Sequence, residues 1–167
     1  MFLKNYTSEV PVSQTIYRIE QVLIKCGVSG ITKEYTPTGG VAALIFHAPS
    51  PSGSGMMAIR LPADVEAAQQ AMWVNYADGD KMTPDGSRLA WNNRKSKCRA
   101  DFKDQAERTA WKIVQDWVEV QMSMIQMRQA EMLQVFMPYL WDGKETFYSR
   151  VKGDGFRMLG TGTSSEQ

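Results

Sequence analysis

The stretch "ITKEYTPTGGVAALIFHAPSPSGSGMMAIRL", residues 31–61, decides the fold class of this chain. It holds three short runs of strand-forming residues, separated by "PTGG" and "PSPSGSG", which are rich in the Gly, Pro and Ser of turns. The middle run, "VAALIFHA" at residues 41–48, is apolar on both faces, which is typical of a central strand. Because short connections favour antiparallel neighbours, residues 31–61 predict a three-stranded antiparallel sheet.

One helix is predicted before this sheet in the sequence and others are predicted after it. Before it, apolar residues spaced by 4, 3, 4 and 3 positions predict a helix from Val12 to Cys26, and Gly27 supplies a left-handed stop. After it, the pattern of "ADVEAAQQAMWVNY", residues 63–76, predicts a second helix. Residues 77–93 contain Gly and Pro without apolar periodicity, and they predict a loop.

The longest periodic pattern of the chain follows this loop. Two rows of apolar residues at helical spacing extend from Phe102 to Phe136, with Asp101 as the predicted cap. "WDGKETFYSRV", residues 141–151, predicts a short helix. The order predicts an α+β fold: helix, three-stranded antiparallel sheet, helix, then a long C-terminal helix packed on the same core. We expect residues 1–152 to form a single domain and residues 153–167 a flexible tail.

Composition narrows the class of function. The chain has 167 residues, a hydrophobic fraction of 43% and a formal net charge of +1, so any electrostatic attraction must come from a local patch. It shows neither an apolar run of about 20 residues nor a signal peptide, which predicts a cytoplasmic protein without membrane attachment. Cys26 and Cys98, the two cysteines, are expected to be reduced thiols in that compartment.

Known catalytic and metal-binding patterns do not occur in the sequence. His47 is the single histidine and lacks the ligand spacing of a zinc site. "DGDKMTPDG", residues 78–86, begins like a calcium loop, but Met82 and Thr83 replace a ligand and the turn glycine. There is no nucleophile elbow or phosphate-binding loop. The sequence therefore predicts a protein that is not an enzyme and binds neither a metal nor another cofactor.

The long helix suggests a protein-binding role. Its apolar arc offers more area than one small sheet covers easily, which favours docking on a partner protein or self-association. Core packing is the ordinary alternative for the same tryptophans and methionines. The candidate interface residues are Trp111, Val118, Met122, Ile125 and Met132.

A basic run before the long helix suggests the alternative function. Residues 92–103, "NNRKSKCRADFK", contain five basic side chains and the single acid Asp101. Such a run can neutralise phosphates of a nucleic acid, with Trp91 or Phe102 stacking on an unpaired base. A loop that is only solvated has the same composition. The candidate contacts for an anion or nucleic acid are Arg94, Lys95, Lys97, Arg99, Lys103 and Trp91.

Four segments carry a resemblance to known proteins. Residues 19–48, 59–67, 105–122 and 134–140 ("QVFMPYL") together resemble a family of small proteins encoded by tailed bacteriophages and prophages. The resemblance covers about Ser13 to Tyr148 and implies a phage or mobile-element origin and action in the bacterial cytoplasm. It carries no activity and no catalytic residues.

The predicted element order is also similar to that of double-stranded RNA-binding domains, in which lysines open the second helix and grip phosphates. Here "PADVEAAQQ", residues 62–70, has Asp64 and Glu66 and no lysine at that place. This departure argues against duplex RNA binding through that helix, because the phosphate contacts would be missing.

Overall fold

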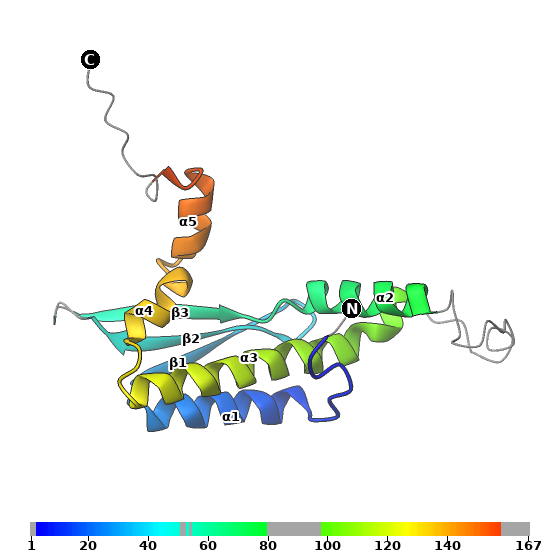
Figure 1. Cartoon of the computed structure of the whole chain (residues 1–167), viewed down its shortest axis with the longest axis horizontal. Helices are drawn as coiled ribbons and strands as arrows, with labels where there is room; N and C mark the ends of the chain where they lie inside the picture. The colour runs from blue at the N-terminus through cyan, green and yellow to red at the C-terminus, as the bar shows by residue number, and fades with distance from the viewer. Residues whose placement is uncertain (1–2, 51–52, 54, 80–97, 158–167) are drawn as a thin grey trace, which may run out of the picture. The chain divides into compact units, whose positions relative to one another are not determined.

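The computed structural model describes residues 3–50, 53, 55–79 and 98–157. The order of its elements confirms the predicted α+β class, with a helix, a three-stranded antiparallel sheet, a helix and a long helix in succession (Figure 1). Two of the elements, η2 and η3, are 3-10 helices. The elements are α1 (Val12–Lys25), β1 (Gly30–Tyr35), β2 (Val41–Pro49), β3 (Met56–Pro62), α2 (Val65–Gly79), η2 (Arg99–Phe102), α3 (Lys103–Gln126), α4 (Met132–Phe136), η3 (Met137–Tyr139) and α5 (Phe147–Gly153).

Strand β2 is the middle strand of the sheet and pairs antiparallel with β1 on one side and β3 on the other. Phe46 stands opposite Ile31 of β1 and Ile59 of β3. Alternate residues of a strand point to opposite faces. β2 has buried side chains on both faces, with Phe46 on one face and Ala43 on the other. The ring of Phe136 in α4 packs edge-on against Phe46, with ring centroids 5.3 Å apart. The central position predicted from the apolar sequence of β2 is confirmed.

The chain divides into two compact units, with boundaries inside helices α1 and α3 and in the connection between β3 and α2. One unit comprises residues 1–23 and 63–120, and the other comprises residues 24–62 and 121–167. That residues 1–152 form one domain stays a prediction. Most of the expected flexible tail, from residue 158 onward, lies outside the described residues.

The first unit is helical. Ala68 and Met72 of α2 pack with Ala106 and Ala110 of α3, and the three alanines allow a close approach of the two helices. The stripe predicted for the first helix is also observed, because its three central residues are buried. These residues are Ile16, Ile19 and Leu23.

Helix α3 ends earlier than its apolar pattern predicts. The pattern continues to Phe136, but α3 stops at Gln126 because Arg128 adopts a left-handed conformation with φ of 57°. The N–H of Arg128 donates to the carbonyl of Ile125, and the N–H of Gln129 donates to that of Met124, which is the hydrogen-bond pattern of a Schellman motif. The expected single helix from 102 to 136 is therefore wrong: it is two helices, α3 and α4, separated by a turn.

Candidate functional site

The most distinctive local structure of the second unit is the segment from Leu140 to Arg150, which lies beside strand β3. Leu140 forms an antiparallel bridge with Ile59, and the N–H of Trp141 donates to the carbonyl of Ala58 at 2.8 Å. The outer edge of β3 therefore receives a two-residue extension of the sheet. This extension fixes the backbone on which the site is built.

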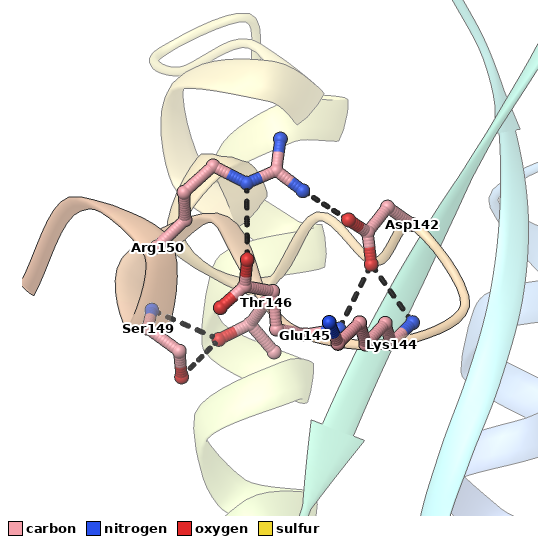
Figure 2. Close-up of polar contacts among 6 residues, drawn as sticks. All are labelled: Asp142, Lys144, Glu145, Thr146, Ser149 and Arg150. Atoms are coloured by element: carbon pink, nitrogen blue, oxygen red, sulfur yellow. Dashed lines mark hydrogen bonds and ion pairs between the residues drawn. The ribbon is translucent and has the colours of Figure 1, made fainter. Parts of the chain in front are cut away.

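A tight turn follows the extension. Asp142 Oδ1 accepts hydrogen bonds from the backbone N–H groups of Lys144 and Glu145, both at 2.8 Å (Figure 2). Gly143 lies between Asp142 and Lys144 with φ of +96°, a conformation that L side chains rarely adopt. The hydroxyl of Thr146 then accepts from the N–H of Ser149 and caps helix α5. The expected helix over residues 141–151 is thus a turn followed by α5, which begins only at Phe147.

A pocket of about 270 Å³ lies between β3, the turn and α5. One wall is the start of β3, and the opposite wall combines the extension, the turn and the first residues of α5. Its lining is mainly apolar, with charged groups from the turn and from α5. The lining residues are Met56, Met57, Ala58, Leu140, Trp141, Asp142, Glu145, Phe147 and Arg150.

The charged groups of the pocket form one connected cluster. Arg150 pairs with Asp142 Oδ2 through Nη2 and donates from Nε to Glu145 Oε1 at 3.3 Å (Figure 2). The backbone N–H groups of Glu145 and Lys144, together with the charge of Arg150, lower the pKa of Asp142 below its ordinary value. Asp142 is therefore ionised at neutral pH. Two carboxylates and one guanidinium leave the lining with a formal charge of −1.

Trp141 is held in place from the sheet. The guanidinium of Arg60 lies 4.9 Å from the centroid of the Trp141 ring. Arg60 is itself paired with Glu34 of β1, with Nε and Nη2 at 2.8 and 2.7 Å from Glu34 Oε2. This chain of contacts across the sheet, together with the backbone bond to Ala58, orients the tryptophan at the pocket wall.

The predicted protein-interface residues of the long helix lie elsewhere. Trp111, Val118 and Met122 are 0%, 0% and 1% exposed, so their side chains are packed inside the folded chain. Ile125 and Met132 are half-buried, and Met132 belongs to α4 rather than α3. A partner could reach the first three only if the helix gave up its own packing.

Most of the predicted nucleic-acid contacts, namely Arg94, Lys95, Lys97 and Trp91, lie outside the described residues. The two that are described belong to the first unit. Arg99 Nη2 lies 3.7 Å from Glu66 Oε1, and Lys103 is exposed at the start of α3 next to Asp104. Asp101 does not cap the long helix as predicted: it lies in η2, where its carboxylate accepts from the N–H of Cys98 at 2.7 Å, and α3 begins at Lys103.

Phe102 belongs to an aromatic cluster that the sequence patterns do not identify. Its ring centroid lies 5.4 Å from that of Tyr76 and 6.4 Å from that of Trp73, both on α2. All three side chains are half-buried, and Phe102 packs against the core formed by α2 and α3. The ring therefore contributes to the packing of the first unit.

The described residues also bear on metal binding, membrane insertion and thiol chemistry. No group of three His, Cys, Asp or Glu side chains among them could hold a metal ion. No helix in the same part of the chain is long and apolar enough to span a membrane. Cys26 and Cys98 are free thiols, and partial burial raises the pKa of Cys26 even though Gln126 donates to its sulfur at 3.3 Å.

The pocket beside β3 was not predicted from the sequence. "DG" at residues 142–143 is a recognisable turn signal, and Thr146 is a recognisable helix cap. Neither signal shows that the turn would lie against β3, about 80 positions earlier in the chain. Comparisons of the chain with protein-family models, with curated proteins and with solved structures found no match. The function must therefore be argued from this geometry.

Proposed function

We propose that this chain is a non-enzymatic protein-binding module that holds a bulky apolar side chain of a partner protein in the pocket beside β3. The observation that carries the proposal is the pocket itself, whose walls combine two methionines, a tryptophan and a phenylalanine with a fixed cluster of charges. A phage or mobile-element origin and action in the bacterial cytoplasm belong to the same proposal, and they rest on the sequence resemblance alone.

The size of the pocket supports a side chain as its occupant. Sites that enclose small molecules usually have volumes of about 300 to 1,000 Å³, whereas this pocket has about 270 Å³. That volume suits one large side chain with part of its backbone. Anchors of this kind, seated in a pocket and surrounded by polar groups, contribute most of the binding energy in many protein interfaces.

The rim of the pocket can adapt to an anchor of irregular shape. Met56 is 50% exposed, and its unbranched thioether can change rotamer at little cost. Trp141 is fixed by its backbone bond to β3 and by Arg60. A rigid aromatic wall facing flexible methionines is a suitable arrangement for recognising a protein segment.

The charged groups support binding rather than acid–base catalysis. Both oxygens of Asp142 already accept hydrogen bonds or an ion pair, Oδ1 from two backbone N–H groups and Oδ2 from Arg150. Its lowered pKa keeps it ionised, whereas a general acid or base works best with a pKa near the working pH. Asp142 thus stabilises the turn and fixes the position of Arg150.

The alternative proposal is a nucleic-acid-binding accessory protein that uses the basic segment 94–103. Its support is the sequence composition of that segment and the aromatic cluster around Phe102 beside Arg99. Against it, Glu66, Asp101 and Asp104 accompany the two described basic residues. Carboxylates at this position repel phosphates.

A peptide selection tests the main proposal. Random 12-residue peptides are selected on the immobilised full-length protein, and their affinities are measured for the wild type and for Met56→Glu. We expect the peptides to share a bulky apolar residue and to bind Met56→Glu at least about tenfold more weakly, because a carboxylate at the rim must be desolvated when the pocket fills. Met127→Glu is the matched control, since Met127 is 61% exposed and does not line the pocket.

Two results would contradict the proposal. One is that no peptide is selected, and the other is that the selected peptides bind Met56→Glu as tightly as the wild type. Labelled single-stranded DNA is tested in parallel at low and high salt. Binding of DNA that weakens steeply with salt would favour the nucleic-acid alternative.

A further inference from the structure

We propose that the partner segment is an extended peptide that joins the outer edge of β3 and carries a Lys or Arg next to its apolar anchor. This inference rests on the proposed function, because it names the kind of segment that the pocket takes. Three observations support it. The edge of β3 already pairs with Leu140 and Trp141, this pairing stops before the start of β3, and the carboxylate of Glu145 lies in the pocket at that place.

The chain itself shows that the outer edge of β3 can pair. Leu140 stands opposite Ile59, and Trp141 donates to the carbonyl of Ala58. Backbone groups of a strand alternate in direction, so Met56, two residues before Ala58, directs its N–H and carbonyl to the same outer side. On the inner side Met56 and Pro49 form a non-hydrogen-bonded pair, so β2 does not use these backbone groups of Met56.

The extension ends just before it would reach this part of the edge. In the antiparallel register of Leu140 and Trp141, the next two residues would stand opposite Met57 and Met56. They are Asp142 and Gly143, which instead belong to the turn in which Asp142 accepts from the N–H groups of Lys144 and Glu145 (Figure 2). The start of β3 is therefore left beside the pocket, where a strand of another protein can continue the sheet.

The charges at this place favour a cationic partner. Of the three charged residues that line the pocket, two are carboxylates and one is Arg150. Glu145 uses Oε1 to accept from Arg150, and its Oε2 has no partner among the residues that the structure describes. An ammonium or guanidinium of the peptide can bind this oxygen, whereas a peptide carboxylate would meet two like charges.

The test uses the peptides selected in the previous experiment and introduces one substitution or one backbone N-methyl group into each. Replacing the basic residue by norleucine should weaken binding at least about fivefold, and Glu145→Gln should remove most of this difference. N-methylation of the peptide backbone should weaken binding at alternate residues only, because a strand directs every second N–H to its neighbour. Raising the salt concentration should weaken the basic peptide more than its norleucine version.

The outcomes separate this inference from the proposed function. Peptides that are sensitive to Met56→Glu but indifferent to norleucine, to N-methylation and to Glu145→Gln would overturn the inference and leave the pocket as the binding site. Peptides that are indifferent to Met56→Glu as well would overturn both. Because the norleucine and N-methyl changes are made in the peptide, they decide the question even if Glu145→Gln does not fold.

Discussion

Asp116 connects the N-terminal segment of the chain to helix α3. Its Oδ1 accepts from Lys112 Nζ at 2.8 Å, and its Oδ2 accepts from Lys4 Nζ at 2.9 Å and from Asn5 Nδ2 at 3.0 Å. Partial burial raises the pKa of this carboxyl, but the hydrogen bonds from Lys112, Lys4 and Asn5 outweigh burial and hold the pKa well below its ordinary value. The ionised form is therefore stabilised by folding.

This shift predicts a loss of stability in acid. The folded-state pKa of Asp116 lies below the unfolded-state value of about 3.9, so its contribution is complete above about pH 5 and is lost as the pH falls toward the folded-state pKa. Asp116→Asn should lower the free energy of unfolding by about 2 kcal/mol at neutral pH and by a smaller amount at about pH 3. Urea denaturation at the two pH values measures both quantities.

Glu9→Gln provides the matched control for this prediction. Glu9 is an exposed carboxylate in the same N-terminal segment, and its removal should change the free energy of unfolding by no more than about 0.5 kcal/mol at either pH. An equal loss of stability for Asp116→Asn at neutral and acid pH would contradict the prediction, because it would show that the charge of Asp116 contributes nothing.

The end of helix α3 depends on a residue that is poorly suited to its conformation. Arg128 has φ of 57°, which costs a residue with a Cβ about 1 kcal/mol relative to glycine. Arg128→Gly should therefore raise the free energy of unfolding, by up to about 1 kcal/mol, without changing the fold. Thermal and urea denaturation measure the change.

Gln129→Gly separates this effect from a general tolerance of glycine in the turn. Gln129 is not among the residues with positive φ, so glycine there gains no relief of strain and should lower the stability. If Arg128→Gly were less stable than the wild type, the left-handed conformation would not be strained, and side-chain contacts of Arg128 would have to explain the end of α3.

Arg128 also explains why the sequence predicts some helices and strands better than others. The sheet and α1 have two kinds of signal that agree, apolar periodicity and Gly or Pro at their ends, and both predictions are confirmed. At Arg128 only periodicity was available, because apolar residues recur at helical spacing on both sides of the turn. The glycine or asparagine that usually takes the left-handed conformation after a helix is missing here, so two helices are predicted as one.

The candidate site shows a different limit of sequence reasoning. Its turn and its helix cap have local signals in Asp142, Gly143 and Thr146. The pocket, however, exists only because the backbone of Leu140 and Trp141 pairs with β3, and no local pattern encodes a pairing between residues so far apart in sequence. The exposed methionine on the rim, Met56, was predicted only as part of a strand.

At the scale of the whole molecule, the chain divides into two units, and helices α1 and α3 each contain residues of both. The division falls after Leu23 in α1, after Pro62 at the end of β3 and after Val120 in α3. Each of these two helices is a single element, from Val12 to Lys25 and from Lys103 to Gln126. Unfolding of one unit would leave an unpaired helix end in the other, which is costly because helix formation is cooperative.

We therefore expect the chain to unfold in a single cooperative transition. The calorimetric and van't Hoff enthalpies should agree, and circular dichroism and tryptophan fluorescence should give the same midpoint. Hydrogen exchange is the sharper measurement, since the slowest amides of β2 in one unit and of α2 in the other should open with the same free energy. Two heat-capacity peaks, or two groups of slow amides with different opening free energies, would show that the units fold independently. The single domain predicted for residues 1–152 would then be wrong.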